Sequence, residues 1–205
     1  MKGKFIVIEG PDGSGKTTVT KSLLEHYEKL GIKIIHTREP GGTQIGERIR
    51  ELLLDPIFQE MDPKAEALLY AASRAQHVEE KIRPAIEEGY LVLCERYIFS
   101  SLVYQGLSRE LGVDNILKIN NFATLDFEPD MVIYLDPKDQ MTRDRITDRP
   151  LDRLEQEEDF ARKVQTNYRI LANKMKDSLF IIDASKSPQE VFASCLEEIE
   201  KERVK

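Results

Sequence analysis

Short apolar runs alternate along this chain with longer segments in which apolar residues recur at helical spacing. The short runs predict strands over Phe5–Ile8, Ile32–Thr37, Leu91–Glu95, Met131–Leu135 and Leu179–Asp183. The longer segments predict helices over Lys16–Leu30, Thr43–Leu54, Pro63–Glu88, Asn115–Ala123, Lys138–Thr147, Phe160–Lys176 and Pro188–Lys201. Continuously apolar strands that alternate with helices predict a five-stranded parallel sheet with helices on both faces. We see no repeat or linker, and expect a single α/β domain over 1–205.

Charge and composition narrow the class of protein. The chain has 30 Lys and Arg against 37 Asp and Glu, a net charge of -7, and therefore lacks the basic surface that nucleic-acid binding needs. No apolar run approaches the roughly 20 residues of a membrane span, and we expect no signal peptide because a strand begins almost at once. Two cysteines give no disulfide framework, which favours a cytoplasmic protein.

The first predicted strand leads into a glycine-rich turn that matches the phosphate-binding pattern G-x-x-x-x-G-K-[ST]. The residues expected to surround the triphosphate of ATP are Gly10, Pro11, Asp12, Gly13, Ser14, Gly15, Lys16, Thr17 and Thr18. Backbone N–H groups and the positive end of the helix dipole favour phosphate oxygens there. We expect Lys16 to reach the β- and γ-phosphates and the Thr17 hydroxyl to ligate Mg²⁺. A strand, this loop and a helix in that order predict a P-loop NTPase fold.

Polar residues also follow the second predicted strand, in the run Arg-Glu-Pro-Gly-Gly-Thr at 38–43. The glycines and Thr43 are equally typical of a turn that caps the next helix. Beside a phosphate loop, Arg38 is well placed to hold a second anionic substrate. Arg50 lies two turns into the following helix, where a ligand contact and an ordinary surface position are both open.

The third predicted strand ends in Glu95 and Arg96. Glu95 lies level with the phosphate loop and is a candidate for the magnesium site, while Arg96 can offer two parallel donors to a phosphate. A structural ion pair between the two residues is the alternative. Ser101, Tyr104 and Gln105 follow on one side of a helical turn, with hydroxyl and amide groups that could read the edge of a base.

An arginine-rich segment at 143–153 interrupts the second half of the chain. Its interleaved acids are typical of a solvated helix. Phosphoryl transfer, however, gains from cations that surround the developing charge on the γ-phosphate. Because Pro150 ends a helix after Arg149, we expect a short arginine-rich lid at about 141–155, with Arg149 as the first candidate for the transition-state cation and Arg153 and Arg143 behind it.

Taken together, the chain resembles the thymidylate kinases, the P-loop family that phosphorylates dTMP with Mg-ATP, over nearly its whole length. The matching stretches are Phe-Ile-Val-Ile-Glu-Gly-Pro-Asp-Gly-Ser-Gly-Lys-Thr-Thr at 5–18, Arg-Glu-Pro-Gly-Gly-Thr at 38–43, Ala-Ala-Ser-Arg-Ala-Gln-His at 71–77, Glu-Arg-Tyr with Ser-Ser-Leu-Val-Tyr-Gln-Gly within 95–106, Asp-Arg-Leu-Glu-Gln-Glu at 152–157 and Ile-Asp-Ala-Ser-Lys-Ser-Pro at 182–188. Their order makes the resemblance specific, since the phosphate loop alone occurs in many families.

The resemblance implies a role for most of the candidate residues. Arg74 and Gln105 would bond the thymine beside Ser101, and Tyr70 would stack on its ring. Asp12 would hold the 3′-hydroxyl, Arg38 and Arg96 the dTMP phosphate, and Tyr104 would crowd the 2′ position. The loop at 183–187 would flank adenine, and Lys16, Arg96 and the lid arginines would be the catalytic cations of a bacterial-type enzyme. The family also implies a homodimer, formed through the helix Pro63–Glu88.

Three residues depart from the family pattern, in which Asp commonly stands in place of Glu95, Phe in place of Tyr70, and Asp or another residue in place of Phe99. The longer Glu95 bears on rate and metal preference, whereas Tyr70 keeps an aromatic face. Two other classes remain open at this point. A GTPase-type switch would usually carry Asn-Lys-x-Asp, which is absent from the sequence. A kinase for another nucleoside or nucleotide is distinguished only by its acceptor.

Overall fold

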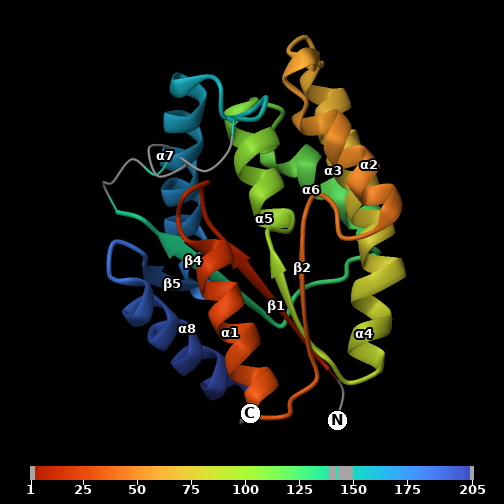
Figure 1. The fold of residues 1–205 in the computed structure, drawn as a ribbon. Coiled ribbons are helices and arrows are strands. Elements are labelled where there is room, and N and C mark those ends of the chain that lie inside the picture. Colours follow the sequence, from red (N-terminus) through yellow and green to blue (C-terminus); the bar gives the residue numbers. More distant parts are fainter. Residues whose placement is uncertain (1–2, 139–141, 143–149, 204–205) are drawn as a thin grey trace.

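Five parallel strands form the centre of the computed structural model, which describes residues 3–138, 142 and 150–203 (Figure 1). They are β1 (Lys4–Glu9), β2 (Ile34–Arg38), β3 (Leu91–Glu95), β4 (Met131–Asp136) and β5 (Phe180–Asp183), in the spatial order β2-β3-β1-β4-β5. Each prediction of a strand is confirmed to within a few residues, and so is the parallel sheet.

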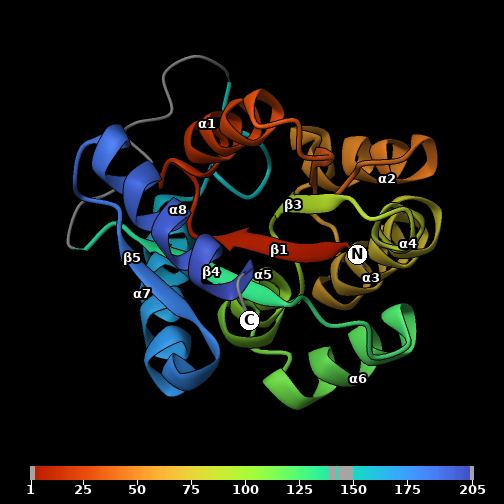
Figure 2. The same cartoon turned by 90° about the horizontal axis from the view of Figure 1, so that it is seen from below.

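Helices cover both faces of the sheet (Figure 2). They are α1 (Lys16–Lys29), α2 (Gln44–Leu54), α3 (Pro63–His77), α4 (Arg83–Glu87), α5 (Ile98–Ser101), α6 (Val113–Thr124), α7 (Glu158–Lys174) and α8 (Pro188–Arg203). Short 3₁₀ turns lie at Pro56–Phe58 and Lys176–Ser178, and π-helical segments at Val78–Ile82 and Leu102–Ser108. Helices α1 and α8 pack together on one face, and α5, α6 and α7 lie on the other, with α2 packed against α3.

The apolar residues of each strand divide between the two faces because successive side chains point in opposite directions. Ile6 and Ile8 of β1 face a core that includes Leu23 of α1, whereas Phe5 and Val7 face a core with the segment that joins α3 to α4. Both faces are buried, as expected for a parallel sheet whose strands are apolar throughout.

Some elements differ from the sequence-based prediction. The helix expected over Pro63–Glu88 is two helices joined by a π-helical segment, and the helical stretch 98–108 was not among the predicted helices. Most of the helix predicted at Lys138–Thr147 lies outside the described residues, and Lys138 itself is in a turn. The extent of the domain, 1–205, stays a prediction. Within the described ranges, none of the helices is both long and apolar enough to cross a membrane.

Candidate active site

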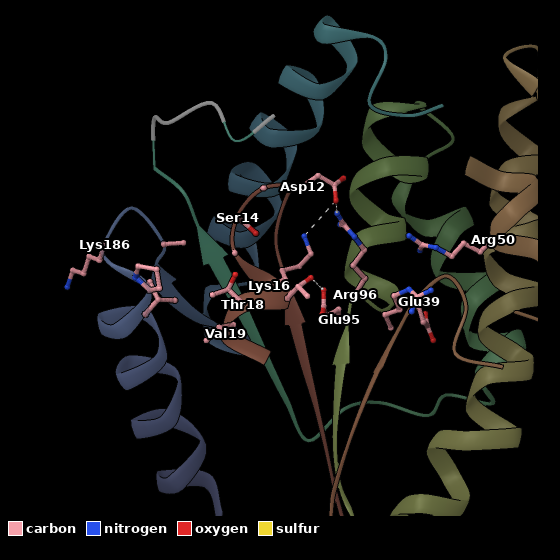
Figure 3. Close-up of a pocket in the computed structure, with 17 residues that line it drawn as sticks. Asp12, Ser14, Lys16, Thr18, Val19, Glu39, Arg50, Glu95, Arg96 and Lys186 are labelled. Carbon is pink, nitrogen blue, oxygen red and sulfur yellow. Dashed lines mark hydrogen bonds and ion pairs between the residues drawn. The ribbon is translucent and has the colours of Figure 1, made fainter. Parts of the chain in front are cut away.

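The phosphate loop connects β1 to α1 at the carboxyl edge of the sheet (Figure 3). Gly15 precedes the first turn of α1 with a φ of 91°, in the left-handed region that a glycine adopts at low cost. Gly13 has a φ of 76°, and a Cβ atom there would lie 2.0 Å from the carbonyl oxygen of Thr142. Glycine is therefore required at Gly13 both by the turn and by the approach of the chain from the region of the predicted lid.

Lys16 is buried within this loop. Its Nζ atom donates to the carbonyl oxygens of Gly10 at 3.0 Å and Pro11 at 2.9 Å, and lies 3.9 Å from Asp12 Oδ1. Burial and the positive charge of Arg96 lower the pKa of Lys16 to about 8, against the opposing effect of nearby carboxylates. The ammonium group is held by weak carbonyl partners, which a phosphate can replace.

Glu95, at the end of β3, has one carboxylate oxygen on the phosphate loop and one on β2. Thr17 Oγ1 donates to Oε2 at 2.8 Å, and His36 Nε2 lies 2.8 Å from Oε1. Burial favours the neutral acid, but these two hydrogen bonds and the charge of Lys16 outweigh it, so the pKa of Glu95 is lowered. An ionised carboxylate beside a hydroxyl oxygen is the donor set that Mg²⁺ prefers, and these two residues fit that ion.

Arg96 connects the phosphate loop to the helices on the other face. Its Nη2 atom donates to Asp12 Oδ1 at 2.5 Å, and its Nη1 atom to Gly10 O at 3.0 Å and to Tyr168 Oη at 2.8 Å. Tyr104 Oη donates to the other oxygen of Asp12 at 2.8 Å. Burial alone would raise the pKa of Asp12, but the charges of Arg96 and Lys16 lower it well below its ordinary value.

The backbone at Arg96 is strained, since a non-glycine residue there has a φ of 68°. Glu9 is fully buried at the end of β1 and stabilises the turn after Arg96 by hydrogen bonds. Its carboxylate accepts from the backbone N–H groups of Tyr97 at 2.8 Å and Ser100 at 3.1 Å, and from Ser100 Oγ at 2.7 Å. Burial raises the pKa of Glu9. No local pattern predicts this role, because Glu9 simply ends an apolar strand.

One cavity lies at the phosphate loop and a second lies beside it. Arg96 and Asp12 are among the residues that line both. The other lining residues of the second cavity include the predicted base-binding set Tyr70, Arg74, Ser101, Tyr104 and Gln105, together with Arg50, Leu54, Asp152 and Leu154. The structure thus brings the predicted substrate residues together, with one exception. Arg38 lines the phosphate-loop cavity instead, where its Nη2 atom donates to Glu47 Oε2 at 2.9 Å.

Arg74 is buried and already carries several protein partners. Nε donates to Glu39 Oε2 at 2.6 Å, Nη1 to Ser101 Oγ at 3.0 Å and to Asn120 Oδ1, and Nη2 to Tyr97 O at 3.0 Å. One N–H of its five donors is left for a ligand by this arrangement. Glu39 and Asn120 were not predicted, although Glu39 lies in the glycine-rich run after β2.

Whereas Arg74 has a hydrogen-bond donor left, Gln105 has an acceptor left. Its Nε2 atom donates to Glu66 Oε1 at 2.9 Å, while its Oε1 atom is buried and has no hydrogen-bond partner among the described residues. Arg50, by contrast, donates through Nη1 to Pro40 O at 3.0 Å and lines both cavities. The second cavity is therefore lined by an acceptor of Gln105, unpaired within the described ranges, and by the donor residue Arg74.

The predicted lid is only partly described. Arg143 and Arg149 lie outside the described residues. Arg153 is buried, and donates through Nη2 to Glu66 Oε2 at 2.7 Å and through Nε to Leu53 O at 2.8 Å. These contacts are those of a structural residue, and they argue against the predicted role of Arg153 as a catalytic cation.

The cavity at the phosphate loop has a volume of about 700 Å³ and extends to the loop after β5. Ala184, Lys186, Pro188 and Val191 also line this cavity. Lys186 lies across from the start of α1 (Figure 3). Ala184 and Lys186 belong to the loop at 183–187 that was predicted to flank adenine, and the position of adenine stays a prediction.

Comparison with known proteins gives one consistent family. The family model described as thymidylate kinase matches residues 8–195. The chain is 47% identical to a thymidylate kinase of Geobacillus sp. (strain WCH70), over 94% of each chain. It is 45% identical to one of Ligilactobacillus salivarius, over 96% of this chain and 97% of the relative, and 47% identical to one of Pelotomaculum thermopropionicum, over 98% and 94%.

Proposed function

The chain belongs to the thymidylate kinase family, and from this premise we propose how its two cavities divide the work of the reaction. The enzyme transfers the γ-phosphoryl group of ATP to dTMP and gives dTDP and ADP, a step of dTTP synthesis. Asp12 and Arg96 line both cavities, and this observation carries the assignment. With ATP in one cavity and dTMP in the other, the reacting phosphates meet beside these two residues.

On the ATP side, the residues 10–18 hold the triphosphate and Lys16 contacts the β- and γ-phosphates. Thr17 and Glu95 would hold Mg²⁺, whose charge offsets that of the phosphates when it is bound. A phosphate oxygen of dTMP attacks the γ-phosphorus directly while the bond to the β-phosphate oxygen breaks. Catalysis then consists of positioning and charge stabilisation by Lys16, Arg96 and the lid arginine Arg149.

On the dTMP side, Arg74 donates to the carbonyl at ring position 4 and Gln105 accepts from the ring N–H at position 3. Tyr70 stacks on the ring, Ser101 lies beside it, and the Asp12–Tyr104 contact supports a role at the sugar. Arg96 and Arg50 both line the dTMP cavity, and are the nearer candidates for its phosphate. Arg38 remains a candidate only if its contact with Glu47 opens.

An acceptor screen with Mg-ATP across the common nucleoside monophosphates tests the function. We expect kcat/KM to fall in the order dTMP, dUMP, dCMP. Uracil lacks only the methyl group, which is worth roughly 10–200-fold in an apolar pocket. Cytosine also lacks the methyl group and in addition places an amino donor opposite Arg74, so dCMP should fall a further tenfold or more below dUMP. Equal turnover of dCMP and dTMP would identify a kinase for another nucleotide, and guanine-nucleotide binding without an acceptor would favour a switch protein.

We also propose a homodimer through the face formed by α3 with α2 and α6, each of which packs against α3. Large apolar side chains are exposed on all three helices, namely Ile45, Leu52, Leu68 and Phe122. Phe122 is 86% exposed, and large apolar side chains exposed on neighbouring helices support a protein–protein contact at this face. Sedimentation velocity should give a dimer for the wild type and a monomer for Leu68→Glu. The cytoplasmic location, and the lack of nucleic-acid and membrane partners, stay predictions from composition.

A further inference from the structure

Glu66 lies in the first turn of α3 and is fully buried, with 0% of its surface exposed. Its Oε1 atom accepts from Gln105 Nε2 at 2.9 Å. Its Oε2 atom accepts from Arg153 Nη2 at 2.7 Å and from Arg109 Nη2 at 3.3 Å. Two guanidinium groups therefore neutralise one buried carboxylate, and the side-chain amide of Gln105 completes its shell.

This shell decides which way round the Gln105 amide lies. An amide has a donor end and an acceptor end of nearly the same shape, and could in principle present either end to a ligand. An ionised carboxylate only accepts hydrogen bonds, so Gln105 must turn its NH₂ group toward Glu66. Its Oε1 atom is then left facing away from Glu66, buried and without a partner among the described residues. Because Gln105 lines the dTMP cavity, that oxygen is a fixed acceptor for a ligand.

A fixed acceptor distinguishes between pyrimidines. Thymine and uracil carry an N–H at ring position 3, whereas cytosine has a lone pair there and would face the oxygen lone pairs of Gln105. We propose that Glu66 is a specificity-determining positioning residue, which selects the protonated ring nitrogen of thymine by fixing the amide orientation of Gln105. The inference rests on the proposed function, since it takes the cavity to hold the base of dTMP.

Glu66→Gln tests the inference, because a glutamine at this position can donate as well as accept. Gln105 is then free to turn its NH₂ group toward the cavity. We expect the ratio of kcat/KM for dTMP over dCMP to fall by about fivefold or more, the smallest effect of one unsatisfied buried group. The loss should appear in KM and in the dissociation constant of dTMP measured without ATP, rather than in kcat.

Two further variants separate orientation from stability. Arg109→Gln removes a partner of Glu66 Oε2 but keeps the carboxylate, so it should lower the melting temperature and leave the dTMP/dCMP ratio unchanged. The exchanged pair Glu66→Gln with Gln105→Glu keeps the contact between amide and carboxylate and turns an acceptor toward the cavity. This double variant should retain the preference for dTMP. If Glu66→Gln alone does not fold, the double variant tests the role of Glu66 in its place.

The outcomes distinguish this inference from the function on which it rests. A wild-type enzyme without a preference for dTMP would contradict the proposed function itself. A wild-type preference that survives in folded Glu66→Gln, or that is lost equally in Arg109→Gln, would overturn the role of Glu66 and leave the function intact. Loss of the preference in a folded exchanged pair would overturn it as well.

Discussion

The hydroxyl of Thr17 donates to Glu95 Oε2 over 2.8 Å and thereby joins the phosphate loop to the end of β3. The second oxygen of Glu95 lies 2.8 Å from His36 Nε2 on the neighbouring strand β2. A carboxylate one methylene longer than aspartate is thus held from both sides. This arrangement keeps the Glu95 carboxylate facing the loop, at a position where the resemblance leads one to expect aspartate.

Glu95→Gln should weaken the part of nucleotide affinity that depends on Mg²⁺. The substitution removes the charge but keeps an oxygen for Thr17, and loss of a partner close to a metal typically costs about 10–100-fold in metal affinity. Calorimetric titration with ADP, with and without Mg²⁺, measures the effect. Affinity for ADP alone should change little, and the exposed Glu51→Gln is the matched control. If Mg²⁺ raised the ADP affinity of the variant as much as that of the wild type, Glu95 would not be part of the magnesium site.

Lys16→Ala should leave the fold intact and lower kcat by roughly 10²-fold or more, because a charge is lost where charge moves in the transition state. The exposed Lys21→Ala, one turn further along α1, should have no effect. Near-normal turnover of a folded Lys16→Ala enzyme would contradict the assignment.

The pKa of Lys16 predicts a dependence on pH in the free enzyme. Since that pKa is lowered to about 8, the ammonium group loses its proton as the pH rises through this value. We expect kcat/KM for ATP, which reports groups of the free enzyme, to fall above about pH 8. A profile that stays flat to pH 10 would show that Lys16 keeps its charge in the loop.

Arg149 and Arg153 should behave differently on replacement by alanine. Arg149→Ala is expected to lower kcat far more than it raises either KM, by roughly 10³–10⁵-fold if the enzyme depends on this cation. Arg153→Ala leaves the buried Glu66 short of one charge partner and should cost roughly 3 kcal/mol of stability. Kinetics and chemical denaturation of both variants, with Arg143→Ala for comparison, test this division. A stable Arg153→Ala enzyme with low kcat would restore Arg153 as a catalytic cation.

The sequence predicted the parts of the site that local pattern or strand position determines. The phosphate loop is one continuous motif, and Arg38, Glu95 and Arg96 follow strands whose carboxyl ends meet at one edge of a parallel sheet. These features do not depend on how the helices pack. They could therefore be predicted from the sequence.

The buried carboxylates that support the site could not be predicted from the sequence in the same way. Glu66 stands in the first turn of a helix, where acidic residues ordinarily face solvent, and its partner Arg153 lies 87 residues away in a run of mixed charge. Only the packing of α3 against the segment after Pro150 brings them together. The same holds for Asn120 and Arg74, which meet across α6 and α3.

Asp152 provides a test of charge in the dTMP cavity. Burial and the nearby negative charges of Glu155 and Asp12 raise its pKa from 3.8 to about 6. The folded protein therefore holds this proton more tightly than the unfolded chain between about pH 4 and pH 6. Over that range the contribution of Asp152 to the free energy of unfolding falls as the pH rises, and above about pH 6 its full cost remains.

Asp152→Asn removes this cost. Asp152 Oδ1 accepts from the N–H groups of Leu154 at 3.0 Å and Glu155 at 3.1 Å, and an asparagine oxygen can accept both. At pH 7 we expect the variant to be more stable by about 1–2 kcal/mol, less than the full shift would give because the side chain is partly exposed. The melting temperature should rise by roughly 2–8 °C at pH 7, with no gain at pH 4. The exposed Glu60→Gln serves as control. An equal rise in melting temperature at both pH values would mean that a difference in hydrogen bonding, rather than in charge, causes the effect of the substitution.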